Sequence, residues 1–220
     1  TRLVQRGKRE KSDLPIVALV GYTNAGKSAI MNRMLMLTHK QDKQVEEKDM
    51  LFATLDTRQR SIQMEDHRSF LLVDTVGFVS KLPHHLVKAF KATLEEVMLA
   101  DLLLLVVDSS YENHEFQLEV TRQVLRDLGA IDKEILLVYN KSDLIENPMI
   151  HNQNHHAVSV SAKTGANFPR LLQLISEKVF QDHQEVELMI PYERGDILSY
   201  VMEKTKVLDK KYLEEGTWIR

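Results

Sequence analysis

Eight consecutive residues near the start of the chain match a phosphate-binding pattern, G-x-x-x-x-G-K-[ST]. This pattern binds phosphate when it stands between a strand and a helix. Its two glycines allow the backbone to turn successive N–H groups toward phosphate oxygens, and the following helix adds its positive N-terminal end. We expect Lys27 to reach the outer phosphates and the Ser28 hydroxyl to ligate Mg²⁺. The loop consists of Gly21, Tyr22, Thr23, Asn24, Ala25, Gly26, Lys27 and Ser28.

A second candidate motif follows the apolar segment 69–73 and consists of Asp74, Thr75, Val76 and Gly77. At the end of a strand, Asp74 could hold Mg²⁺ through a water molecule or could simply cap the next element. Gly77 favours the first interpretation, because a residue without a side chain lets its N–H approach a γ-phosphate closely. Together the two motifs predict a site for a triphosphate with its magnesium ion.

A segment between these motifs could supply one more ligand to Mg²⁺. A threonine hydroxyl there would complete the coordination of the metal only while a γ-phosphate is present, and this would order the loop. Thr54 and Thr57 both qualify by their position. The segment consists of Phe52, Ala53, Thr54, Leu55, Asp56 and Thr57.

Two further motifs predict recognition of a guanine base. Asp143 can accept hydrogen bonds from the ring N–H and the exocyclic amine of guanine, and adenine lacks this pair of donors. Asn140 can either bond the base or tie neighbouring loops together, while the stem of Lys141 can cover the ring. A backbone N–H of the last motif would lie near the guanine oxygen. The motifs are Asn140, Lys141, Ser142 and Asp143, followed by Ser161, Ala162 and Lys163.

The elements that carry these motifs predict a three-layer α/β fold, the G-domain type of P-loop NTPase. Strands are expected at 14–20, 60–64, 69–73, 102–107, 134–139 and 157–160, and helices at 27–37, 82–98, 116–128 and 168–180. Asn167 is expected to cap the start of the last helix. Their alternation predicts a mainly parallel sheet with both faces covered. The tight connection between the second and third strands predicts one antiparallel edge strand.

The chain is predicted to divide into three parts. Residues 1–13 are rich in charge and are expected to form a linker, the alternative being an arm that touches RNA phosphates. Residues 14–184 form the expected GTP-binding domain. Residues 185–220 contain an alternating segment at 186–190 and a short helix at 196–203, which predict a small C-terminal α+β subdomain.

The composition of the 220 residues excludes several classes of protein. With 43% hydrophobic and 28% charged residues, the chain is neither disordered nor fibrous. The absence of cysteine excludes disulfides and a thiol nucleophile, and the net charge of −3 argues against nucleic-acid binding by bulk electrostatics. No apolar run is long enough to span a membrane and no signal peptide is visible. We therefore expect a cytoplasmic, monomeric protein. Because the chain opens without methionine, we also expect it to be a piece of a longer one.

The order of the motifs resembles the translation-factor-related branch of the P-loop GTPases and, within it, the HflX family. The resemblance extends from residue 15 to about residue 192 and rests on the phosphate loop, on residues 51–56 (LFATLD), on 74–84 (DTVGFVSKLPH) and on 92–96 (ATLEE). It implies that Thr54 ligates Mg²⁺ and that residues 52–56 contact the nucleotide. It also implies binding to the large ribosomal subunit and splitting or rescue of stalled or hibernating ribosomes.

Phe78 stands where many relatives carry the glutamine that orients the attacking water. We therefore expect slow intrinsic hydrolysis of GTP, with Lys27 and Gly77 acting on the transferred phosphate and a partner rearranging the loops. His84 and His85 could approach the water or lie solvated at the start of a helix. The histidines at 151, 155 and 156 are predicted to belong to a solvated loop, because no thiolate or carboxylate accompanies them.

Three functions are compatible with these motifs. The favoured one is a Mg²⁺-dependent GTP hydrolase that acts as a switch on the ribosome. A scaffold that binds RNA or protein under control of GTP, with negligible turnover, is the first alternative, and Phe78 fits it. A GTPase of rRNA or tRNA maturation would share the nucleotide motifs, but residues 52–56 and 82–84 favour the HflX resemblance.

Overall fold

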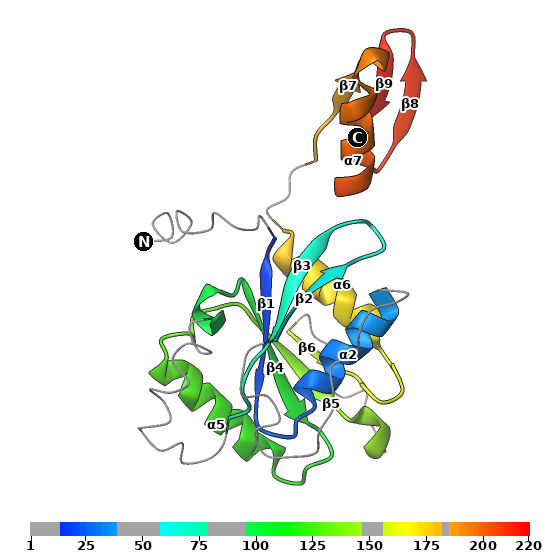
Figure 1. Ribbon diagram of the computed structural model, residues 1–220. Coiled ribbons are helices and arrows are strands. Elements are labelled where there is room, and N and C mark those ends of the chain that lie inside the picture. The colour runs from blue at the N-terminus through cyan, green and yellow to red at the C-terminus, as the bar shows by residue number, and fades with distance from the viewer. Residues whose placement is uncertain (1–13, 39–57, 79–95, 147–155, 182–184) are drawn as a thin grey trace.

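The main sheet has six strands, in the order β2-β3-β1-β4-β5-β6 (Figure 1). The computed structural model describes residues 14–38, 58–78, 96–146, 156–181 and 185–220. All neighbouring strands of this sheet run parallel except β2, which is antiparallel to β3. The predicted α/β class and its antiparallel edge strand are thereby confirmed. The strands are β1 (Ile16–Gly21), β2 (Arg58–Gln63), β3 (Ser69–Asp74), β4 (Leu102–Asp108), β5 (Ile135–Asn140) and β6 (Ala157–Ser159).

Helices cover both faces of this sheet. Helices α2 (Lys27–Thr38) and α6 (Phe168–Val179) pack on one face, and α5 (His114–Asp127) packs on the other. Of the helix expected at 82–98, the structure describes only the end, where residues 96–99 are helical. The linker expected at 1–13 lies outside the described residues.

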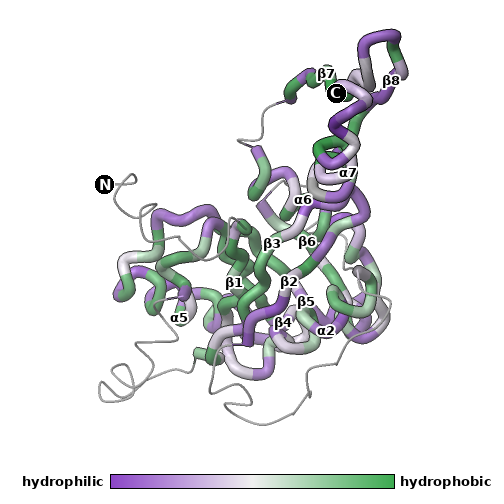
Figure 2. Tube along the Cα trace, turned by 45° about the horizontal axis from the view of Figure 1, so that its top comes forward, coloured by the Kyte–Doolittle hydropathy of each residue, from purple (hydrophilic) through white to green (hydrophobic). Residues whose placement is uncertain are grey.

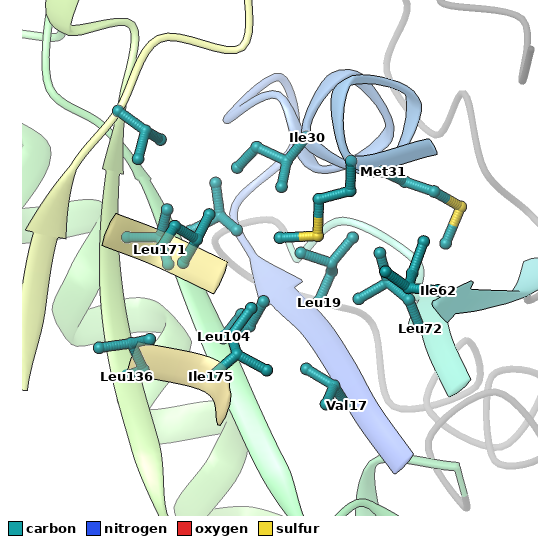
Figure 3. Close-up of a cluster of buried hydrophobic side chains, with 14 of the residues drawn as sticks. Val17, Leu19, Ile30, Met31, Ile62, Leu72, Leu104, Leu136, Leu171 and Ile175 are labelled. Atoms are coloured by element: carbon teal, nitrogen blue, oxygen red, sulfur yellow. The ribbon is translucent and has the colours of Figure 1, made fainter. Parts of the chain in front are cut away.

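Strand β1 is buried on both faces, as a central strand of a parallel sheet should be. Val17 and Leu19 point toward α2 and α6, while Ala18 and Val20 belong to the cluster on the side of α5. Figure 3 shows Leu19 facing Ile30 and Met31 of α2. The first turn of α2, which follows the phosphate loop directly, is therefore anchored in the core.

The predicted capping role of Asn167 at the start of α6 is wrong. Asn167 does occupy the N-cap position, but it has a left-handed backbone (φ 62°) and its side chain makes no capping hydrogen bond. Its Nδ2 donates instead to the carbonyl of Ser159, at 2.8 Å. Asn167 thus ties the start of α6 to the end of β6.

A second, three-stranded antiparallel sheet is formed by residues near the end of the chain, in the order β7-β9-β8 (Figure 1). The expected strand at 186–190 is β7, the expected helix at 196–203 is α7, and the segment 206–220 forms a hairpin. The elements are β7 (Leu188–Ile190), the 3-10 turn η3 (Tyr192–Arg194), α7 (Gly195–Lys204), β8 (Lys210–Leu213) and β9 (Gly216–Ile219). Along the described parts of the chain, no helix combines the length and apolarity needed to cross a membrane.

Candidate nucleotide-binding site

The described motif residues gather at one edge of the main sheet. Parallel strands end on the same side, and ligands of open α/β sheets bind beyond the carboxyl ends of the strands. Gly21 ends β1, Asp74 ends β3 and Asn140 ends β5, while Ser161 follows β6 closely. Of the predicted residues, 52–57, His84, His85, His151 and His155 lie outside the described residues.

Lys27 is buried inside the loop that it closes. Its Nζ donates to the carbonyls of Gly21, at 3.2 Å, and Tyr22, at 2.9 Å. Burial lowers the pKa of Lys27 from 10.5 to about 8, and the nearby Asp74 carboxylate opposes this shift. The loop is therefore curled around the ammonium group of Lys27.

Two glycines allow the close approaches on which this loop depends. At Gly26, the backbone is left-handed (φ 90°) and a Cβ would lie 2.2 Å from Nδ2 of Asn140. At Gly77, a Cβ would lie 2.8 Å from Cγ2 of Thr23 and 3.1 Å from Nζ of Lys27. Any side chain at Gly77 would thus press on the lysine and the phosphate loop. The residue brings a bare backbone next to the ammonium group.

Ser28 and Asp74 form the part of the site that suits Mg²⁺. The hydroxyl of Ser28 donates to Oδ2 of Asp74 at 2.6 Å, and Asp74 is fully buried. A hydroxyl and a carboxylate are the hard oxygen ligands that Mg²⁺ prefers, and this ion usually takes few ligands from protein and the rest from phosphate and water. The donor set therefore fits the ion. Among the described residues, no cluster of three His, Cys, Asp or Glu side chains offers a different kind of metal site.

Thr75, Val76 and Phe78 hold the second motif against the first. The Thr75 hydroxyl donates to the carbonyl of Leu19 at 2.6 Å, and the side chains of Val76 and Phe78 are almost fully buried. The backbone of Phe78 pairs with the phosphate loop, because its N–H donates to Gly21 at 3.0 Å and its carbonyl accepts from Thr23 at 2.9 Å. The ring of Phe78 belongs to the core cluster that contains α5 residues. This side chain brings no polar group to the site.

Asn140 joins the phosphate loop to the last motif. Its Nδ2 donates to the carbonyl of Ala25 at 3.0 Å, and its Oδ1 accepts from the N–H of Ala162 at 3.0 Å. All three residues are buried. Of the two roles considered for Asn140, the structure therefore has the one in which the side chain ties loops together.

Asp143 lies exposed in the turn η1 (Ser142–Leu144) after β5. Its Oδ1 accepts a hydrogen bond of 2.6 Å from the hydroxyl of Ser161, which is itself buried. Ser142 anchors the turn, since its N–H donates to the carbonyl of Val160 at 3.1 Å. The carboxylate predicted to select guanine is thus oriented by the motif that follows β6.

Two charged residues of this site were missed by the sequence analysis. Asp108, at the end of β4, accepts a hydrogen bond and ion pair from Nζ of Lys141 at 2.7 Å. Arg33, on α2, donates to the carbonyls of Ala162 and Lys163. The position of Asp108 at the carboxyl end of an apolar strand could have revealed it. Within the described parts of the chain, Arg33 bonds backbone carbonyls, which leave no trace in the residue types.

This combination of fold and motif geometry agrees with comparisons to known proteins. The chain belongs to the family described as 50S ribosome-binding GTPase, whose model matches residues 16–141. A GTP-binding protein from the archaeon Sulfolobus solfataricus, solved in complex with GDP, shares the fold with a TM-score of 0.58. It is 27% identical, and the match covers 76% of this chain and 53% of that one.

The predicted resemblance to HflX is also confirmed. GTPase HflX of Caldanaerobacter subterraneus subsp. tengcongensis is 42% identical over 219 residues, which are 100% of this chain and 49% of that protein. GTPase HflX of Escherichia coli is 39% identical over 215 residues, or 96% of this chain and 49% of that protein. The chain spans about half the length of these curated relatives.

Proposed function

We propose that the chain binds GTP with Mg²⁺ and hydrolyses it as a molecular switch. One observation carries the proposal: Asn140 bonds Ala25 of the phosphate loop and Ala162 of the last motif at once. A single nucleotide could then lie with its phosphates on one loop and its base on the other. Asp143, which accepts a hydrogen bond from Ser161, would then select guanine.

The reaction needs positioning and charge stabilisation rather than a covalent intermediate. Lys27 would exchange the carbonyls of its own loop for the outer phosphates, and the N–H of Gly77 would bond the γ-phosphate. Bound Mg²⁺ would neutralise charge on the phosphates, held by Ser28, by Thr54 and, through water, by Asp74. Residues 52–56 would contact the nucleotide, as the resemblance to HflX implies.

Hydrolysis without a partner should be slow. Phe78 replaces the expected glutamine, and its side chain is 2% exposed in the core. The side chain at this position cannot orient the attacking water, so another residue or the partner must supply the group that does. A supplied group is worth roughly 10³–10⁵ in rate in related enzymes. GTP hydrolysis would then report that the partner has docked.

The partner we propose is the large ribosomal subunit, and the outcome of docking is the splitting or rescue of stalled or hibernating ribosomes in the cytoplasm. The description of the family, 50S ribosome-binding GTPase, supports the choice of partner, and the resemblance to HflX implies the outcome of docking. We further propose that residues 14–184 form the GTP-binding unit, that 185–220 form a second unit, and that the protein acts as a monomer.

The direct test is release of inorganic phosphate from GTP by the purified protein, titrated with large ribosomal subunits. We expect a slow basal rate and a stimulation of at least about tenfold that saturates, with ATP as the matched control that is not hydrolysed. Equal rates with GTP and ATP would contradict the assignment of the base.

A scaffold that binds a partner under control of GTP is the second candidate, and the buried ring of Phe78 favours it. The same titration separates the two functions. If GTP strengthens co-sedimentation with ribosomal subunits but phosphate release does not rise, the scaffold is correct and the hydrolytic switch is not.

A further inference from the structure

Arg33 reaches from the helix of the phosphate loop to the backbone of the base motif. Its Nε donates to the carbonyl of Ala162 at 2.8 Å, and its Nη2 donates to the carbonyl of Lys163. The side chain also packs under Gly165, where a Cβ would lie 3.6 Å from Cδ and Nη1 of Arg33. Among the described residues, the hydrogen bonds of this guanidinium go to backbone carbonyls and not to a carboxylate.

These bonds set the orientation of two consecutive peptide groups. In a trans peptide the C=O and the N–H point in opposite directions, and the described residues contain no cis peptide. The carbonyl of Ala162 points to Arg33, so the N–H of Lys163 points away from α2. The carbonyl of Lys163 also points to Arg33, and the N–H of Thr164 points to the opposite side.

The opposite side is where the base-selecting carboxylate lies. The N–H of Thr164 donates to Oγ of Ser161 at 3.1 Å, and this hydroxyl donates in turn to Oδ1 of Asp143 at 2.6 Å. A continuous series of bonds thus runs from Arg33 through one peptide group and one hydroxyl to Asp143. It is separate from the bridge that Asn140 makes.

We infer that Arg33 is a positioning residue for guanine recognition. It holds the peptides at 162–164 so that the N–H of Lys163 faces the base and the Ser161 hydroxyl orients Asp143. Because Arg33 lies on the helix that begins in the phosphate loop, it also fixes the distance between the two halves of the site. This inference rests on the proposed binding of GTP.

The test compares three ligands on the variant Arg33→Gln by calorimetry: GDP, IDP and inorganic tripolyphosphate. IDP lacks the exocyclic amine, so the preference for GDP over IDP measures how well Asp143 is placed. Hydrogen bonds from a charged group are worth about 1.5–3 kcal/mol. We therefore expect GDP affinity to fall about tenfold or more, the preference for GDP over IDP to shrink, and tripolyphosphate affinity to stay unchanged.

Two further variants make the result interpretable. Arg33→Lys keeps the positive charge but has a single amino group to donate to the two carbonyls. We expect an intermediate loss of GDP affinity. This variant replaces Arg33→Gln in the test if Arg33→Gln does not fold. Arg126→Gln removes an exposed arginine that pairs with Glu119 on α5, and should change none of the affinities.

Two outcomes would overturn the inference. One is an unchanged preference for GDP over IDP in both Arg33 variants. The other is an equal loss for GDP and tripolyphosphate, which would reduce Arg33 to a support of the whole fold. A wild-type protein that binds no guanine nucleotide would instead refute the proposed function.

Discussion

The base half of the site (residues 140–143 and 161–163) and the phosphate half (residues 21–28 and 74–77) differ in the hydrogen bonds that their polar groups make. On the base side, Asn140 and Ser161 make bonds that align neighbouring motifs, and Asp143 lies exposed in its turn. On the phosphate side, the polar groups bond one another, because Lys27 bonds its own loop and Ser28 bonds Asp74.

This difference implies a division of labour. A base can enter a frame whose bonds need not break, so its contacts add to affinity at little cost in reorganisation. A phosphate with its metal must first displace existing bonds of Lys27, Ser28 and Asp74. The phosphate half is therefore where the protein would sense which nucleotide is bound, and the base half is where it would select the nucleotide.

The strongest test of the base half is Asp143→Asn. Loss of two hydrogen bonds to a charged acceptor, each worth about 1.5–3 kcal/mol, should weaken GDP binding by roughly a hundredfold or more. The affinity for xanthosine diphosphate should rise, because the side-chain amide of the variant can donate to the carbonyl that replaces the exocyclic amine of guanine. Calorimetry with both nucleotides measures the exchange. Asp132→Asn, a substitution at an exposed position, is the control and should change neither affinity. An unchanged GDP affinity in Asp143→Asn would show that the base does not bind at Asp143.

The bridge between the halves is tested by Asn140→Ala. This change strands a buried carbonyl at Ala25 and a buried N–H at Ala162, and each such group costs about 1–3 kcal/mol. The free energy of unfolding, measured by urea denaturation without nucleotide, should fall by roughly 2–5 kcal/mol. Gln123→Ala removes two exposed bonds, one donated to Asp127 and one accepted from Arg126, and should cost less than about 1 kcal/mol. Equal costs for the two variants would show that Asn140 is no bridge.

The phosphate half can be probed by pH, because the pKa of buried Lys27 lies at about 8. Only the ammonium form pairs with phosphate, so above pH 8 binding must take up a proton. GDP affinity should then fall by up to about tenfold for each pH unit. Calorimetry in two buffers of different ionisation enthalpy should show uptake of nearly one proton at pH 9 and of only about a tenth of a proton at pH 7. Binding heats that match in both buffers at pH 9 would contradict this.

The lowered pKa of Lys27 also makes the free energy of unfolding depend on pH. The pKa of Lys27 is lower in the folded protein than in the unfolded chain. Between pH 8 and pH 10.5 the unfolded chain therefore binds more protons. The contribution of Lys27 to the free energy of unfolding then rises with pH across this window.

The smallest expected effect concerns the contact between Asp108 and Lys141. The ion pair is partly exposed, so Asp108→Asn should remove only about 0.5–1 kcal/mol. GDP affinity should weaken about two- to fivefold, and the difference from wild type should shrink as salt is added. Asp127→Asn on α5 is the matched control. A loss that does not respond to salt would mean that Asp108 acts through its bonds to Ser110 rather than through charge.

The sequence predicted those parts of the site that depend on residue type at fixed spacing. The glycine-rich loop, Asp74 at the end of β3 and the motif after β5 all lie where the alternation of strands and helices places them. The role of Asn140 stayed open because an amide can bond a base or a backbone equally well. Only the distances to Ala25 and Ala162 decide it.

What the sequence could not predict depends on contacts between distant segments. Arg33 and Ala162 are 129 positions apart, and their bond involves a carbonyl that every residue possesses. The side chain of Asn167 does not cap α6; it has a left-handed backbone and donates to the carbonyl of Ser159, and neither feature follows from its residue type. The substitution at Phe78 was visible as a missing glutamine, but its backbone pairing with Gly21 and Thr23 was not.

The two edge strands of the main sheet affect how readily another molecule can add a strand to it. Figure 2 shows β1 mostly hydrophobic, whereas the outermost strand β2 is largely hydrophilic, with Arg58, Gln59 and Arg60 along it. At the other margin, β6 has only three residues. Short or arginine-bearing outer strands offer a poor template for strand addition by another molecule. The main sheet should therefore resist edge-to-edge pairing with another molecule.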